Sequence, residues 1–168
     1  SPLAHPLAEW AGAKVYGLPD PNVGHGEVSL EEDGGAGFKP DVLVKDGDVF
    51  GGPDWTLEAI TTPGHMSNHV CYALKEENAL FSGDHIMGWS TTVISPPDGN
   101  MRQYFASLDK IKARGFSTLW PTHGPPVTDV APFIDAYATH RRAREHSIVV
   151  RLKAGDTLIP EMVKVIYK

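Results

Sequence analysis

The chain has a single cysteine among its 168 residues and no long apolar run. One cysteine excludes an internal disulfide framework and favours a reducing compartment, so we expect a cytoplasmic protein. No apolar stretch reaches the roughly 18–20 residues that a membrane-spanning helix needs, and the first residues lack the charged and apolar regions of a signal peptide. Cys71 lies in an alternating apolar stretch, which predicts a buried, inert thiol.

Charge is distributed unevenly along the chain. Residues 1–139 contain 8 basic and 18 acidic residues, whereas residues 140–168 contain 7 basic and 3 acidic residues. The net charge of −6 therefore combines an acidic body with a basic tail. A basic tail is able to contact nucleic acid phosphates, but a solvated helix face with arginine stems lying along it explains the same pattern.

Hydrophobic patterning predicts an α/β domain followed by helices. Residues 17–40 are rich in glycine, proline and acid and predict a long loop, and residues 41–50 predict a β-hairpin around Asp46-Gly47. Strands are expected at 55–61, 69–74, 79–81 and 117–120. Helices are expected from Asn100 to Arg114, from Asp129 to about Lys153, and within 157–167. The first of these helices should turn one face inward, made of Met101, Tyr104, Phe105, Leu108 and Ile111.

Three short segments place a potential metal ligand where a strand-like run meets glycine or proline. They are Thr62–His65 (TPGH), Ser82–Asp84 (SGD) and Pro121–Gly124 (PTHG). Each of His65, Asp84 and His123 has an ordinary explanation alone, as a turn histidine, a loop cap or an unpartnered loop residue. Three such junctions in one chain favour a metal site, because imidazole and carboxylate ligands suit zinc, manganese or iron.

The order TPGHxxxH, SGD, HG resembles the later motifs of the metallo-β-lactamase superfamily. In that family a His-x-His-x-Asp-His cluster comes first, and none of the eight histidines here forms it. The opening residues, 1–17, resemble the segment that follows the cluster. The resemblance implies the C-terminal part of a four-layer αββα sandwich, with the first half largely missing. It divides the chain into residues 1–139, the metallo-β-lactamase-like domain, and residues 140–168, a linker helix that begins a winged-helix module.

By this resemblance, His65 and His123 each serve one of two metal ions, and Asp84 bridges both. The ions are expected to be zinc, with manganese or iron as alternatives. A metal pair generates hydroxide at neutral pH and polarises an ester, thioester, amide or phosphodiester. The acid that orients the attacking water belongs to the missing first motif, so the family's general base lies before residue 1. With three ligands for two ions, we expect the chain alone to bind metal weakly and to hydrolyse poorly.

Other polar residues near these segments have less defined roles. His69 follows His65 by four residues and is expected to support the site rather than bind metal. His85 follows Asp84 directly and should face the other way. A polar stretch follows Asp84 and is expected to line a substrate pocket or to satisfy loop backbone; it consists of Ser90, Thr91 and Thr92, with Trp89.

Two classes of function stay open from the sequence. The first is a metallohydrolase, acting on a small ester or thioester, as in the glyoxalase II-like branch, or on single-stranded RNA, as in the branch with a C-terminal winged helix. The second is a non-catalytic binding or oligomerisation module with a vestigial metal site. The half-sandwich exposes apolar sheet surface. We therefore expect a partner, either an N-terminal portion of the same protein or a second copy, and no membrane.

Overall fold

The computed structural model describes residues 3–19 and 38–167. Most of the predicted loop, 17–40, therefore lies outside the described residues. The chain forms two compact units, residues 1–130 and 131–168. The predicted boundary after residue 139 falls inside the second unit, and the predicted winged-helix identity of the C-terminal segment stays a prediction.

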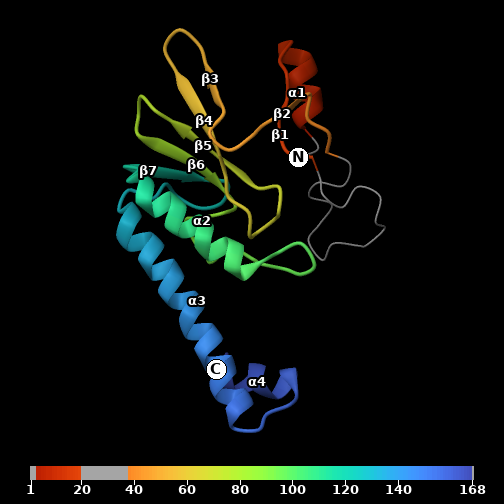
Figure 1. Cartoon of the computed structure of the whole chain (residues 1–168), viewed down its shortest axis with the longest axis vertical. Coiled ribbons are helices and arrows are strands. Elements are labelled where there is room, and N and C mark those ends of the chain that lie inside the picture. Colours follow the sequence, from red (N-terminus) through yellow and green to blue (C-terminus); the bar gives the residue numbers. More distant parts are fainter. Residues whose placement is uncertain (1–2, 20–37, 168) are drawn as a thin grey trace. The chain divides into compact units, whose positions relative to one another are not determined.

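The first unit is built on a five-stranded sheet in sequence order (Figure 1). Its strands are β3 (Val49–Gly51), β4 (Thr56–Thr61), β5 (Val70–Leu74), β6 (Ala79–Gly83) and β7 (Thr118–Pro121). β3 to β6 are antiparallel neighbours, whereas β7 pairs parallel with β6. Because β5 runs opposite to its neighbours, β4, β6 and β7 share one direction and end at the same edge of the sheet.

Helix α2 (Met101–Arg114) connects β6 to β7 and lies along one face of the sheet (Figure 1). The Asn100 side chain accepts a hydrogen bond from the Gln103 N–H and caps the helix, as predicted. Tyr104, Leu108 and Ile111 are buried. The prediction for Met101 was wrong: this side chain is 37% exposed, because it occupies the first helical position, beyond the core.

A second, two-stranded sheet pairs β1 (Tyr16–Gly17) parallel with β2 (Val42–Leu43), after helix α1 (Ala4–Ala11). The predicted hairpin over 41–50 was wrong. A turn does form at Asp46-Gly47, but β2 and β3 on either side of it belong to different sheets. The physical reason is tertiary pairing, since the Val44 N–H donates to the Gly17 carbonyl and the Gly47 N–H donates to the Ala59 carbonyl.

The described residues cover only part of the face of the five-stranded sheet opposite α2. Directly paired residues share a face, so Tyr72, Phe81 and Trp120 lie in one row. Tyr16 covers part of this face, with its ring 4.8 Å from that of Phe50. Farther along the row, Phe81 is 45% and Trp120 48% exposed, so large apolar side chains face solvent there.

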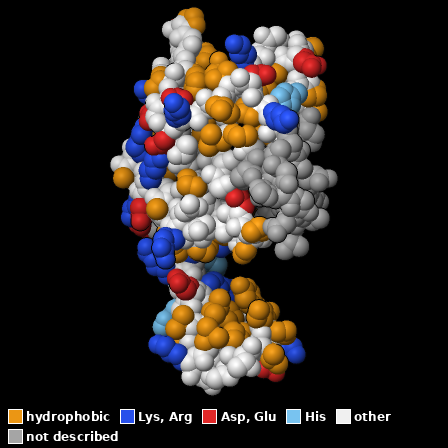
Figure 2. Space-filling view, turned by 45° about the vertical axis from the view of Figure 1, so that its right-hand side comes forward, with side chains coloured by type: hydrophobic (Ala, Val, Ile, Leu, Met, Phe, Trp, Pro, Cys, Tyr) orange, Lys and Arg blue, Asp and Glu red, His pale blue; other side chains and the backbone are white. Residues whose placement is uncertain are grey.

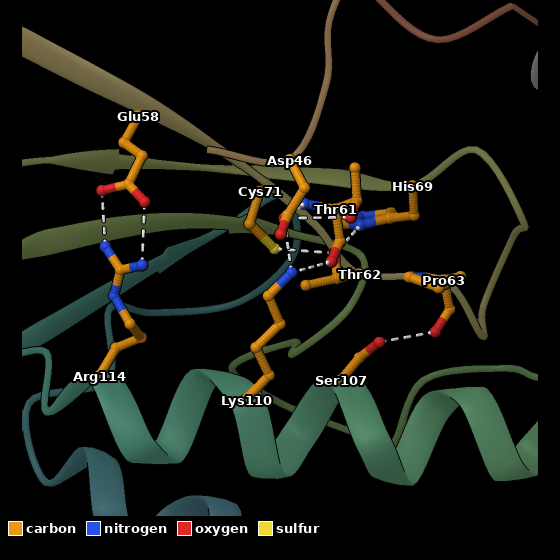
Figure 3. Close-up of polar contacts among 10 residues, drawn as sticks. All are labelled: Asp46, Glu58, Thr61, Thr62, Pro63, His69, Cys71, Ser107, Lys110 and Arg114. Atoms are coloured by element: carbon orange, nitrogen blue, oxygen red, sulfur yellow. Dashed lines mark hydrogen bonds and ion pairs between the residues drawn. The ribbon is translucent and has the colours of Figure 1, made fainter. Parts of the chain in front are cut away.

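Polar contacts join α2 to the sheet and to the turn before β3 (Figure 3). Lys110 Nζ donates to Asp46 Oδ1 and to the Thr61 carbonyl. Arg114 makes a two-pronged bond with Glu58, its NH1 and NH2 groups lying 2.9 and 2.6 Å from the two carboxylate oxygens. The hydrogen bonds from Arg114 lower the pKa of Glu58 below its ordinary 4.5. This pair therefore stabilises the fold in a pH-dependent way.

Replacing Glu58 by glutamine is expected to lower the free energy of unfolding by about 1 kcal/mol at neutral pH. A carboxylate with a lowered folded pKa adds stability above its unfolded value, and this stability is lost as pH falls through the folded value. The difference between wild type and Glu58→Gln, measured by urea unfolding, should therefore shrink between about pH 5 and pH 3. Glu77→Gln, at an exposed turn position, is the control. A difference that stays constant with pH would contradict this assignment.

The second unit contains most of α3 (Val130–Lys153) and all of α4 (Ile159–Ile166). The Arg144 guanidinium donates to the Ile166 carbonyl at 2.9 Å and lies 4.1 Å from the centre of the Tyr167 ring. Arg151 bonds Asp156 across the turn between the helices. Apolar side chains are exposed on this unit, as Figure 2 shows, among them Val150, Leu152, Ile159 and Val163. None of the described helices has the length and apolar character that a bilayer span requires.

Candidate metal centre

The three predicted ligands follow the three strands that end at one edge of the sheet. His65 comes four residues after β4, Asp84 directly after β6 and His123 two residues after β7. The shared direction of these strands brings all three segments to that edge. Rigid strands thus carry the candidate ligands on short loops, an arrangement typical of functional sites.

Asp84 and His123 are neighbours in space. Asp84 Oδ1 lies 3.6 Å from His123 Nε2, a distance too long for a hydrogen bond. Asp84 Oδ1 is buried and has no hydrogen-bond partner among the described residues. A buried carboxylate oxygen without a donor is costly, so this atom is suited to a cation.

His65 has a defined tautomer. Its Nδ1 lies 2.7 Å from the Val93 carbonyl oxygen. A carbonyl only accepts, so Nδ1 carries the proton and Nε2 carries the lone pair. This is the form of a histidine ligand whose other nitrogen is held by backbone.

The three side chains do not form one ready-made ligand group. Among the described residues, no cluster of three or more His, Cys, Asp or Glu side chains is arranged to hold a metal ion. The His69 ring lies near both segments, 6.2 Å between ring centres from His65 and bonded to the Asp84 backbone. The metal-ligand roles of His65, Asp84 and His123 stay predictions.

His69 organises a chain of hydrogen bonds beneath the site, and Figure 3 shows the part of it that joins His69, Thr62 and Cys71. The Asp84 N–H donates to His69 Nε2 at 3.2 Å, so His69 Nδ1 carries the proton and donates to Thr62 Oγ1 at 2.8 Å. The Cys71 thiol donates to the Ser82 carbonyl, which leaves its sulfur to accept from the Thr62 hydroxyl at 3.2 Å. This chain fixes the Asp84 backbone to the ends of β4 and β5.

The protonation of His69 agrees with its bonding. Burial, with a smaller effect of nearby His65, lowers its pKa to about 4, although the charge of Asp84 opposes the shift. The ring is therefore neutral at pH 7, as a hydrogen-bond acceptor at Nε2 must be. Gly83 leaves the space that the ring occupies, since a Cβ there would lie 2.7 Å from His69 Nε2.

His85 is buried beside the site rather than in it. Burial, followed by the nearby His69, lowers its pKa to about 3. Neither ring nitrogen makes a hydrogen bond among the described residues. The His85 carbonyl accepts a bond of 2.8 Å from the Tyr104 hydroxyl, which ties the Asp84 loop to α2.

Thr92 holds the Asp84 loop, which agrees with the loop-backbone role that the sequence left open for this polar stretch. Its hydroxyl lies 2.7 Å from the Asp84 carbonyl and 3.1 Å from that of His85. Thr92 is 1% exposed, whereas Ser90 is exposed and Thr91 half-buried. The polar stretch was itself the available signal, but only the backbone conformation decides which hydroxyl turns inward. Pocket roles for Ser90 and Thr91 stay predictions.

Comparison with known proteins identifies relatives of this chain. The sequence profile of the metallo-β-lactamase superfamily matches residues 3–123. A beta-lactamase-like protein 2 homolog from Caenorhabditis elegans is 41% identical over 103 residues, which make up 61% of this chain and 34% of that protein. The atrochrysone carboxyl ACP thioesterase AgnL7 from Paecilomyces divaricatus is 30% identical over 151 residues, 87% of this chain and 45% of that protein.

A solved structure shares the fold. The di-iron-bound form of the protein TTHA1623 superposes with a TM-score of 0.58 and 26% identity, over 75% of this chain and 65% of that one. The chain thus spans less than half the length of the two curated relatives above.

Proposed function

Because the chain belongs to the metallo-β-lactamase superfamily, we propose that it is the C-terminal portion of a metal-dependent hydrolase. Its fold is part of that superfamily's α/β architecture. Members of the superfamily typically bind metals, as the di-iron-bound structure illustrates. In this proposal His65, Asp84 and His123 hold part of a two-metal site.

The single observation that carries the proposal is the environment of Asp84. Its buried Oδ1 has no hydrogen-bond donor among the described residues, and a second potential ligand, His123, stands 3.6 Å away. Two imidazoles and one carboxylate fit zinc, manganese or iron, and we propose zinc. The remaining ligands, and the acid that orients water, are proposed to come from an N-terminal portion of the same protein.

The residues around the proposed metal site have distinct roles in it. When bound, the metal pair lowers the pKa of water and polarises the electrophile. The negative charge of Asp84 compensates the cations, and His69 and Thr92 fix the Asp84 backbone from both sides. The Val93 carbonyl holds His65 in the tautomer that presents Nε2.

We propose a small ester or thioester as the substrate. Residues 1–130 carry 17 acidic and 8 basic residues, which disfavours a polyanion at the site. One relative is named as an acyl-carrier-protein thioesterase. Single-stranded RNA is the alternative, and it rests on the 7 basic and 3 acidic residues of 140–168.

The exposed row of Phe81 and Trp120 supports the proposed partner. The β1–β2 sheet already packs on this face through Tyr16, which contacts the Phe50 ring and accepts a bond from the Tyr72 hydroxyl at its carbonyl. A continuation of that second sheet would cover the rest, and we propose that the N-terminal portion supplies it. Sedimentation of this chain as a dimer would instead assign the face to a second copy.

Zinc binding by the purified chain tests the proposal. Asp84→Asn and His123→Ala are each expected to weaken Zn²⁺ binding at least about tenfold, measured by competition with a chromophoric chelator. His146→Ala, at an exposed position in the second unit, should bind as wild type does. With zinc present, a chain completed by its N-terminal portion should hydrolyse a thioester and leave an RNA oligonucleotide intact.

Two results would overturn parts of this proposal. Zinc binding that is equal in wild type and Asp84→Asn would remove the metal site and favour a non-catalytic module. Metal-dependent cleavage of the oligonucleotide, with no turnover of the thioester, would replace the substrate.

A further inference from the structure

Trp89 is a large apolar side chain beside the candidate metal centre that has no role as a metal ligand or in holding one. Its side chain is 74% exposed, although tryptophan has a large apolar surface whose hydration is unfavourable. Its ring stacks on that of His123, with 6.4 Å between the ring centres and an interplanar angle of 28°. A large aromatic face is thus presented to solvent beside a candidate metal ligand.

The backbone around Trp89 is held from two sides. The Gly88 N–H donates to the His123 carbonyl at 2.8 Å. A Cβ on Gly88 would lie 2.2 Å from the Pro125 carbonyl oxygen, and one on Gly124 would lie 2.9 Å from the Trp89 nitrogen. The two loops therefore pack backbone against backbone, and a side chain at either glycine would separate them. The packing of these two loops therefore holds Trp89 beside His123.

Location distinguishes Trp89 from the other tryptophans. Trp10 is 85% exposed on α1, Trp55 is 44% exposed next to β4, and Trp120 is 48% exposed on the sheet face opposite α2. Among these four tryptophans, Trp89 is the one whose ring stacks on His123, a proposed ligand. An exposed aromatic ring adjoining a reactive centre provides apolar, stackable area at low entropic cost.

We propose that Trp89 is a specificity-determining residue that binds the apolar acyl group of the substrate. This inference rests on the function proposed above and adds the chemical class of the acyl group: apolar, and flat enough to lie against an indole. The acidic character of residues 1–130 favours an uncharged group over the base of an anionic polymer. An acetyl group is too small to cover the indole ring, so its binding affinity should not depend on Trp89.

The test measures binding of carboxylate products to the zinc-loaded protein by calorimetry, so that it does not depend on turnover. The probes are 2-naphthoate, acetate and a single-stranded oligoribonucleotide. Trp89→Ala is expected to weaken 2-naphthoate binding about tenfold and to leave acetate binding unchanged. Trp89→Phe, which keeps an aromatic face, should retain most of the affinity. Trp10→Phe is the matched control at an exposed site on α1 and should behave as wild type.

The outcomes separate this inference from the proposed function. If zinc binds and acetate binds, but 2-naphthoate has the same affinity in wild type and Trp89→Ala, the role of Trp89 is overturned and the metal site stands. If the oligoribonucleotide, and not 2-naphthoate, depends on Trp89, the residue stacks on bases and the acyl assignment is wrong. If zinc binds neither this chain nor the chain completed by its N-terminal portion, the proposed function fails and the inference fails with it. Circular dichroism of each variant confirms that the fold is retained.

Discussion

Gly64→Ala is expected to lower the free energy of unfolding by about 3 kcal/mol or more. Gly64 has φ +143°, a conformation that residues with a Cβ rarely adopt. A Cβ there would lie 2.4 Å from Cα and 2.5 Å from the backbone nitrogen of Tyr104. Tyr104 is 0% exposed within α2, so a shift of the helix away from Gly64 would disturb a buried side chain.

Gly115→Ala is the matched control for this prediction. Gly115 ends α2 with φ +67°, and a Cβ there would meet nothing within 4 Å. Its replacement should cost only the left-handed backbone penalty, about 1–2 kcal/mol. Urea unfolding of both variants separates steric overlap from backbone strain. Equal losses in the two variants would show that the contact with Tyr104 is relieved at little cost.

Replacement of Gly64 is expected to affect the candidate metal centre as well as stability. It directly precedes His65, and its carbonyl accepts a hydrogen bond of 2.8 Å from the N–H of Asn100, the residue that caps α2. Separating Gly64 from Tyr104 would therefore move both the start of α2 and the segment that carries His65.

His69→Ala is expected to cost about 2–4 kcal/mol, the second-largest effect that we predict. The substitution removes a buried ring, leaves the Asp84 N–H without its acceptor and removes the donor to the Thr62 oxygen. Zinc affinity should fall as well, because the Asp84 backbone loses its support.

Two further replacements at His69 distinguish packing from hydrogen bonding. Phenylalanine keeps a ring but no polar atom, whereas glutamine carries both an acceptor and a donor. If the hydrogen bonds position Asp84, glutamine should preserve zinc affinity better than phenylalanine, measured with the chelator assay at a temperature where all variants are folded. The opposite order would assign His69 a packing role alone.

The sequence predicted the regular part of the fold well because its local signals agree with the final packing. β5 alternates in burial, and Asn100 is a strong helix cap. The hairpin at Asp46-Gly47 failed because a turn signal is local, while the pairing of the flanking strands depends on distant residues. Here the Asp46 carboxylate accepts from the Thr61 N–H, which holds the turn against β4 instead.

The candidate site was predictable in its order but not in its contacts. Glycine and proline after each strand marked where His65, Asp84 and His123 would lie. The bond from the Asp84 N–H to His69 depends on the loop after β4 and on the bend at Gly83, where φ is +56°. Likewise, the stacking of Trp89 on His123, which lie 34 residues apart in the chain, requires their two loops to touch backbone to backbone. No periodicity in the sequence encodes either contact.

Cys71, a member of the hydrogen-bond chain beneath the site, is a built-in probe of local opening of the five-stranded sheet. Cys71 is the chain's single thiol and is 0% exposed in the middle strand of the five-stranded sheet. Burial raises its pKa to about 12, so the reactive thiolate is scarce in the closed state. A thiol reagent added to the unmodified protein therefore reacts with Cys71 at the rate at which β5 becomes accessible. The reaction reports local opening without an engineered label.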